Sequence, residues 1–384
     1  MLQIWDMPLQ KFGRWESCRR IAAERFSFAF KQQTAMETNN YPIGLLGGHP
    51  ELLHCVGEKE LQRKKRLIHT TLEEEMSGSL EAEVLAQCTV FRVSLNGTDE
   101  RTPIGQLKGT LSEATGRPVR IIPEESEGSK VMIEVLNDEP SGVPLRAVLL
   151  SPQFRRCSSS LPLPLGLGAD FRPEVLDLDA AADIVITGQN YAELSTMMNV
   201  FIASLLYAVP RDTVRMMLMD LNGDGLSVWK GVRGIEYVTG EKEVCTVLRN
   251  LTNEQMERDG ADIRKTVVFI SGFDEMVDSG EGLSDLLKQL SIQGRHSRYH
   301  FIVSGTNIEG SLMESLRDKE TVRLVFRQAA PEIQDSPASI SGAEALSGEG
   351  DFLLCKGRRT KRIQGPMVTS EECGKIADYL RASY

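Results

Sequence analysis

Residues 181–207 read AADIVITGQNYAELSTMMNVFIASLLY, so that an apolar run, a glycine turn and a long apolar segment follow one another. The run from Ile184 to Thr187 has the length and the β-branched composition of a buried strand, and the segment that ends at Tyr207 has the length of a helix. The order strand, glycine turn, helix is found where a phosphate is bound at the start of a helix. This stretch therefore predicts a phosphate-loop architecture.

The eight loop positions depart from the pattern G-x-x-x-x-G-K-[ST] that binds a nucleotide. Glu193 replaces the second glycine, where a side chain restricts the backbone and a carboxylate repels a triphosphate. Leu194 replaces the lysine, and no Lys or Arg occurs between Ala181 and Val200. The sequence thus predicts a degenerate loop. Its positions are Gly188, Gln189, Asn190, Tyr191, Ala192, Glu193, Leu194 and Ser195.

Composition and charge limit the possible functions. The chain has 384 residues, room for two or three domains, and a net charge of −10, which argues against a general nucleic-acid coat and leaves DNA contact to local basic clusters. The seven cysteines show no C-x-x-C or zinc spacing, which indicates reduced thiols in a cytosol. No signal-peptide pattern and no run of about 18 apolar residues occurs. We expect a cytoplasmic protein with no membrane partner and no bound metal.

Three parts of the chain differ in pattern. Residues 1–66 have no assigned role. Residues 67–160 predict a small α+β domain, in which residues 83–95 are expected to form one strand. Residues 161–384 alternate apolar strands with amphipathic helices, including expected helices at 282–293 and 311–317. This alternation predicts an α/β fold with a parallel sheet covered by helices on both faces.

A basic cluster near the C-terminus is the strongest candidate for DNA contact. It places five positive charges within seven residues, between two apolar runs, residues 351–355 and 363–368, that predict the strands of a hairpin. A basic hairpin tip can contact phosphates, although a solvated turn that balances the acidic surface explains the pattern equally well. A second basic run, residues 62–66, is interpreted as a solvated helix face, with a phosphate contact as the alternative. The residues of the first cluster are Lys356, Arg358, Arg359, Lys361 and Arg362.

The order of these pieces resembles the FtsK/SpoIIIE family of hexameric double-stranded DNA translocases. The small domain is similar to the family's alpha domain, and the chain from about residue 161 is similar to its RecA-like beta domain. Four segments in the family's order carry the resemblance. They are LPLPLGLG (161–168), SLLYAVPRDTVRMMLMD (204–220), LSVWKGV (226–232) and SGAEALSGEGDFLL (341–354). The resemblance implies double-stranded DNA as a partner and assembly into a homo- or hetero-oligomer, a ring hexamer in the family.

The resemblance also places the family's ATPase elements on positions that lack the required side chains. The acidic pair that holds Mg²⁺ and orients the attacking water falls on Ser271 and Gly272. Asp274 and Glu275 lie past the expected strand end, and the sensor glutamine after Thr306 is absent. Asp220, at another strand end, is a candidate for the nucleotide site or a cap of the following turn. No residue is assigned as catalytic.

Two hypotheses remain open. The first is a catalytically inactive pseudo-motor that acts by DNA contact or by assembly with partners and needs no cofactor. The second is an ATP-dependent double-stranded DNA translocase with a non-standard nucleotide site, for which ATP and Mg²⁺ are the cofactors. A coupling ATPase-like subunit of a secretion or conjugation apparatus shares the core, but the small domain and the segment 341–354 favour the FtsK/SpoIIIE resemblance.

Overall fold

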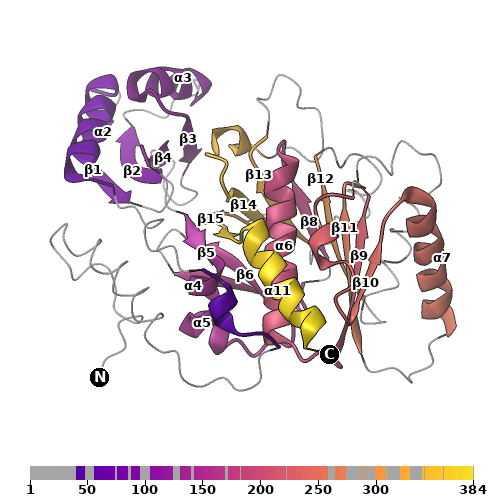
Figure 1. The fold of residues 1–384 in the computed structure, drawn as a ribbon. Coiled ribbons are helices and arrows are strands. Elements are labelled where there is room, and N and C mark those ends of the chain that lie inside the picture. The colour runs from indigo at the N-terminus through magenta and orange to yellow at the C-terminus, as the bar shows by residue number, and fades with distance from the viewer. Residues whose placement is uncertain are drawn as a thin grey trace.

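The computed structural model describes most of the chain in two lobes (Figure 1). The described residues are 40–47, 56–73, 76–84, 88–95, 104–123, 130–139, 142–168, 172–181, 183–221, 223–257, 264–273, 287, 290, 299–306, 308, 321–328, 340, 342–357 and 359–383. Asp274, Glu275 and Arg358 and most of the helices expected at 282–293 and 311–317 lie outside them. Within the described residues, no helix is long and apolar enough to span a membrane.

The small lobe is, in its described residues, a four-stranded antiparallel sheet of order β1-β2-β4-β3 with two helices. Residues 83–95, expected as one strand, contain the end of β1 and all of β2, and Val84 pairs with Thr89. The sequence between these strands, Leu-Ala-Gln, has no turn signal, which is why the pattern did not separate them. The elements are α2 (Glu58–Thr71), β1 (Met76–Val84), β2 (Cys88–Leu95), α3 (Ile104–Thr115), β3 (Val119–Pro123) and β4 (Lys130–Leu136).

Helix α2 belongs to the core of the small lobe. Ile68 of α2 is fully buried against the same cluster as Phe91 of β2 and Ile133 of β4. The helix begins at Glu58 and therefore includes residues that precede residue 67, the expected start of the small domain.

The large lobe is built, in its described residues, on a ten-stranded sheet of order β10-β9-β11-β12-β8-β13-β14-β15-β6-β7. Strands β10 to β13 in this order are parallel to their neighbours, and β14, β15, β6 and β7 form an antiparallel extension. The strands are β6 (Pro162–Leu167), β7 (Pro173–Asp177), β8 (Ile184–Thr187), β9 (Val214–Asp220), β10 (Ile235–Val238), β11 (Lys265–Ser271), β12 (Tyr299–Gly305), β13 (Val322–Phe326), β14 (Asp351–Lys356) and β15 (Arg359–Gln364).

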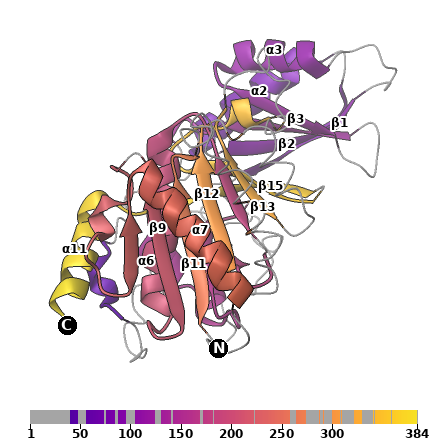
Figure 2. The ribbon, with the colours of Figure 1, turned by 90° about the vertical axis from the view of Figure 1, so that its right-hand side faces the viewer.

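Helices cover both faces of this sheet. Helix α6 lies on one face beneath α11, and α7 lies on the other, as Figure 1 shows and Figure 2 presents from the side. Phe269 of β11 packs in the α6 cluster, whereas its neighbours Val268 and Ile270 pack in the α7 cluster. The predicted α/β fold with a small α+β domain is therefore confirmed. The remaining elements are η3 (Ile43–Leu45), β5 (Val143–Pro144), α4 (Leu145–Leu149), α5 (Pro152–Arg155), α6 (Tyr191–Ala208), η5 (Ser227–Trp229), α7 (Glu241–Glu257), η7 (Ala343–Ala345), β16 (Pro366–Met367) and α11 (Ser370–Ala382).

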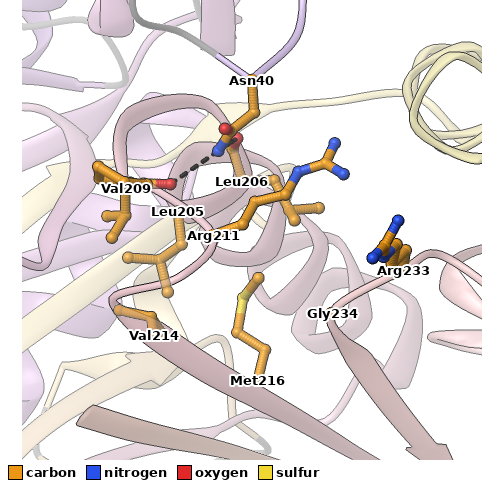
Figure 3. A pocket seen from close by; sticks show the side chains of 10 residues that line it. Asn40, Leu205, Leu206, Val209, Arg211, Val214, Met216, Arg233 and Gly234 are labelled. Atoms are coloured by element: carbon orange, nitrogen blue, oxygen red, sulfur yellow. Dashed lines mark hydrogen bonds between the residues drawn. The ribbon is translucent and has the colours of Figure 1, made fainter. Parts of the chain in front are cut away.

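Residues 40–47, to which the sequence assigned no role, pack on the large lobe. The Asn40 amide donates hydrogen bonds to the carbonyls of Leu206 and Val209 at the end of α6, at 2.8 and 2.7 Å (Figure 3). Tyr41 is buried and its hydroxyl donates to the Ala203 carbonyl. This segment thus satisfies helix-end carbonyls that have no partner within α6.

Candidate functional site: the degenerate nucleotide position

The candidate nucleotide position lies at the carboxyl edge of the parallel strands. Strand β8 ends at Thr187 and α6 begins at Tyr191, so residues 188–190 alone connect them. Strands β9 and β11 end beside each other, with Asp220 opposite Ser271. In open α/β sheets ligands bind at this edge, and the structure brings the predicted loop, Asp220 and Ser271 together there.

Four amide groups around the start of α6 already have acceptors, those of Gln189, Ala192, Glu193 and Leu194. Asn190 caps the helix, because its side-chain oxygen accepts from Ala192 N at 3.0 Å and its carbonyl accepts from the amides of Glu193 and Leu194. The amide of Gln189 donates to the Arg327 carbonyl at 2.9 Å. A phosphate cradle needs such N–H groups directed at the ligand. The connection therefore forms an ordinary capped helix start.

The Tyr191 side chain occupies the space between α6 and the strand ends. Its hydroxyl lies 2.8 Å from the hydroxyl of Ser271, the residue on which the resemblance placed one of the acidic positions. The backbone at Gly225 closes the space from the other side. A Cβ atom there would lie 2.7 Å from Ser195 Oγ and 3.0 Å from the Tyr191 hydroxyl.

The residue at the lysine position is part of the core. Leu194 is fully buried and packs in the α6 cluster, so its side chain does not point toward a ligand. Gly188, the glycine that the pattern keeps, packs against β13, since a Cβ atom there would lie 2.6 Å from Phe326 Cβ. The kept glycine therefore has a packing role.

Glu193 is held by the turn before β14. Its Oε1 accepts a hydrogen bond from the Glu349 amide at 2.5 Å. Burial raises the pKa of Glu193, which the bond from the Glu349 amide and the nearby Arg327 only partly offset. The carboxylate is thus directed to a backbone group on the segment 341–354, and it adds negative charge beside the helix start.

Asp220 organises the turn that follows β9. Its Oδ2 accepts from the Leu226 amide at 2.9 Å and from the Tyr237 hydroxyl at 3.2 Å. Two causes raise the pKa of Tyr237 to about 12, of which burial is the larger and the nearby Asp220 carboxylate is the second. These contacts agree with the interpretation of Asp220 as a turn cap. Among the described residues, Asp220 Oδ1 and Ser195 Oγ are buried without a hydrogen-bond partner.

ATP and Mg²⁺, which a phosphate-loop fold implies, do not fit these residues. The amides of Gln189, Ala192, Glu193 and Leu194 are occupied, the lysine position is in the core, and the Tyr191 hydroxyl contacts Ser271 on the metal side of the site. No group of three or more His, Cys, Asp or Glu side chains that could hold a metal ion occurs in the described part of the chain. The sequence missed the role of Tyr191, because no motif pairs a helix-start tyrosine with a serine 80 residues later.

The basic cluster near the C-terminus is divided by the structure. Lys356 and Arg359 are exposed at the β14–β15 hairpin, which confirms the predicted hairpin, and Lys361 forms an ion pair with Glu174. The expectation that Arg362 contacts DNA is wrong, because its side chain is buried and lies within strand β15. Arg358 lies outside the described residues.

Arg362 belongs to a buried group of charges, here called the interlobe ion cluster, which comprises Arg362, Asp351, Glu134 and Arg120. Arg362 Nη2 lies 2.6 Å from Asp351 Oδ2, and Nη1 lies 2.8 Å from Glu134 Oε2 on the small lobe. Arg120 also faces Glu134, at 3.4 Å. Burial alone would lower the pKa of Arg362, but the carboxylates, above all Asp351, hold it well above its ordinary value. The cluster therefore joins β15 to the small lobe.

The second basic run is structural as well. Lys64 is fully buried, donates to the Leu136 carbonyl at 2.6 Å and pairs with Glu60. Arg63 pairs with Asp138 at 2.7 Å. The expected solvated helix face is thus wrong for Lys64, whose charge holds α2 against the end of β4.

Comparison with known proteins shows which fold the chain has and which family model matches part of it. The chain has the fold of RecA-like P-loop ATPases. A solved structure described as the pCW3 conjugation coupling protein TcpA, monomer form with ATPγS, covers 84% of this chain and 99% of its own chain with a TM-score of 0.52 and 13% identity. The FtsK/SpoIIIE family model matches residues 144–279, in agreement with the resemblance that the sequence suggested.

Curated relatives agree with this assignment. The DNA translocase FtsK of Chlorobaculum tepidum is 25% identical over 68% of this chain and 37% of the relative. The DNA translocase FtsK of Caldanaerobacter subterraneus subsp. tengcongensis is 24% identical over 99% of this chain and 57% of the relative. The chain thus spans well under two thirds of the length of these relatives.

Proposed function

We propose that this chain is a catalytically inactive member of the FtsK/SpoIIIE family, a pseudo-motor that acts by DNA contact or by assembly with partners. The observation that carries the proposal is the contact between the Tyr191 and Ser271 hydroxyls across the nucleotide position. This contact adds to the argument from the missing motif residues, because it puts the Tyr191 hydroxyl where a metal and a phosphate would have to lie.

Rescue by another residue would require several coupled changes. Tyr191 would have to leave Ser271, and the amides of Ala192 and Gln189 would have to leave the acceptors that they now bind. A cation would also have to replace Leu194, whose side chain lies in the core. Each change costs a contact before any ligand is gained.

The alternative is an ATP-dependent DNA translocase with a non-standard site, and one observation favours it. Ser195 Oγ and Asp220 Oδ1, both buried, have no partner among the described residues and remain available as ligands. Mg²⁺ prefers near-octahedral oxygen coordination and usually keeps several waters. One hydroxyl and one carboxylate next to Tyr191 and Gly225 leave little room for them, so we prefer the pseudo-motor.

Calorimetric titration with ATP and Mg²⁺ tests the proposal. We expect a Kd weaker than about 100 µM, equivalent to less than about 5.5 kcal/mol of binding free energy, because the triphosphate finds no counter-charge and meets Glu193. Tyr191→Ala, which opens the site, should not restore tight binding, since the lysine is still missing. Binding at about 1 µM that is lost in Ser195→Ala would favour the alternative instead.

DNA contact, which the names of the relatives suggest, is tested at the hairpin. We expect weak, sequence-independent binding of duplex DNA by a monomer and stronger binding by an oligomer, because phosphate contacts add. In anisotropy measurements across a salt series, Lys356→Ala/Arg359→Ala should reduce the log–log salt slope by about 2. Lys375→Ala, which removes an exposed charge on α11, is the matched control and should leave the slope unchanged. An equal slope in the double variant and the parent excludes the hairpin as a DNA contact.

A further inference from the structure

We infer that a groove beside the first turns of α6 binds a segment of a partner protein that carries an apolar side chain next to a basic residue. The groove, here called the α6 groove, has apolar walls and two carboxylates. The walls are formed by Met197, Phe326, Pro366 and Met367, and the carboxylates belong to Glu193 and Glu349. The inference deepens the proposed function, since it names a partner chemistry beside the degenerate site and rests on that site being closed to nucleotide.

The size of the groove fits a side chain. Its cavity volume is about 140 Å³, whereas pockets for drug-sized ligands and cofactors have about 300–1,000 Å³. A nucleotide would have to extend from the groove across the helix start, where the amides of Glu193 and Leu194 are occupied. One apolar side chain inserted from a partner requires no such extension and would serve as the anchor of an interface.

One apolar side chain that lines the groove, Met367, is exposed. Among the described residues, Met367 and Tyr379 are the exposed large hydrophobic side chains, at 38% and 40% of their surface. Met367 lines the groove, and Tyr379 lies on α11 away from the groove lining. Methionine adapts its shape to a bound partner, which suits a wall of a docking groove.

The negative charge of the groove favours a partner segment that carries a basic side chain. The Glu193 carboxylate lies near the guanidinium of Arg327 and near the carboxylates of Asp351 and Glu349, of which Asp351 also pairs with Arg362. Burial outweighs Arg327 and raises the pKa of Glu193, so the carboxylate lacks full compensation. A Lys or Arg on a bound segment would supply it, because a partly buried pair is screened less than an exposed one.

The backbone at Glu349 supports a binding role. Its φ of 56° is in the left-handed region, and no other non-glycine residue in the described part of the chain has a positive φ. Such a conformation costs on the order of 1–3 kcal/mol and occurs preferentially at functional sites. Its two glycine neighbours, Gly348 and Gly350, have φ values of 83° and 89°. Glycine would fit residue 349 better, but it would remove a carboxylate from the groove.

The test uses the full chain labelled with ¹³C at the methionine methyl groups, with Met197 and Met367 assigned through Leu substitutions. The probes are acetyl-Leu-Arg-Lys-amide, acetyl-Leu-Glu-Asp-amide and adenosine. We expect the basic peptide to shift both methyl resonances and to bind about 10-fold more tightly than the acidic one, a difference of about 1.4 kcal/mol. Glu193→Gln/Glu349→Gly should remove this preference, whereas Tyr379→Ser, the matched control, should keep it.

Equal affinity for the two peptides would overturn the charge selection, and unmoved Met197 and Met367 resonances would overturn the groove as a peptide site. Shifts caused by adenosine at lower concentration than by the basic peptide would assign the groove to a nucleoside base instead. These outcomes are separate from the proposed function, because the ATP titration reports on the position filled by Tyr191.

Discussion

The purified protein is expected to show no ATP hydrolysis above background, with or without duplex DNA. Enzymatic turnover is typically about 1–1,000 s⁻¹, and a phosphoryl-transfer site depends on positioned cations and a water-orienting carboxylate. Here Leu194, Ser271 and Gly272 stand at those positions, and the Tyr191 hydroxyl contacts Ser271. A coupled assay with the full chain at micromolar protein concentration is sufficient to measure this.

Restoration of the lysine is the sharpest control for this prediction. Leu194→Lys should leave the protein inactive and should lower its stability, because the side chain at this position is fully buried in the α6 cluster and an unpaired charge there is unfavourable. Turnover of about 1 s⁻¹ in the parent that disappears in Ser195→Ala would contradict the prediction and show that a non-standard site is active.

Arg362→Ala is expected to lower the free energy of unfolding by about 3–5 kcal/mol, since it removes one partner of a buried ion group. The substitution leaves the carboxylates of Asp351, which has no exposed surface, and Glu134 buried without the guanidinium that they face. Urea unfolding followed by circular dichroism gives the difference from the midpoint and the slope.

Arg359→Ala is the matched control for Arg362→Ala. The two arginines lie on the same strand, but Arg359 is exposed, and its loss should change stability by no more than about 0.5 kcal/mol. If Arg362→Ala is as mild as Arg359→Ala, the interlobe ion cluster does not stabilise the fold. The pair also separates DNA contact from stability, because only Arg359 is available to a phosphate.

The sequence predicted the features that depend on local pattern. The apolar run at Ile184 to Thr187 and the helix to Ala208 appear as expected, and the missing loop residues could be read directly from the motif. The contact of Tyr191 with Ser271 could not be predicted, because it depends on the strand order β11-β12-β8, which brings together residues far apart in the chain.

The misassignment of Arg362 has a similar cause. The sequence pattern began the second hairpin strand at Ile363, whereas β15 begins at Arg359 and includes the basic residues. The sequence of residues 356–362 contains five cationic side chains and does not show which of them faces Glu134 of the small lobe. Tertiary packing determines this contact. The pairing of this hairpin with β13 and β6 was not predicted for the same reason.

The packing of residues 40–47 makes the large lobe a discontinuous domain. The chain contributes Tyr41 and Leu46 to the core of that lobe, then builds the small lobe, and returns with Leu145 to the same core. The small lobe is in this sense an insertion. A fragment that starts at residue 142 would leave the end of α6 without its Asn40 contacts and a core position without Tyr41. A fragment that keeps the complete core of the large lobe must therefore begin no later than Asn40.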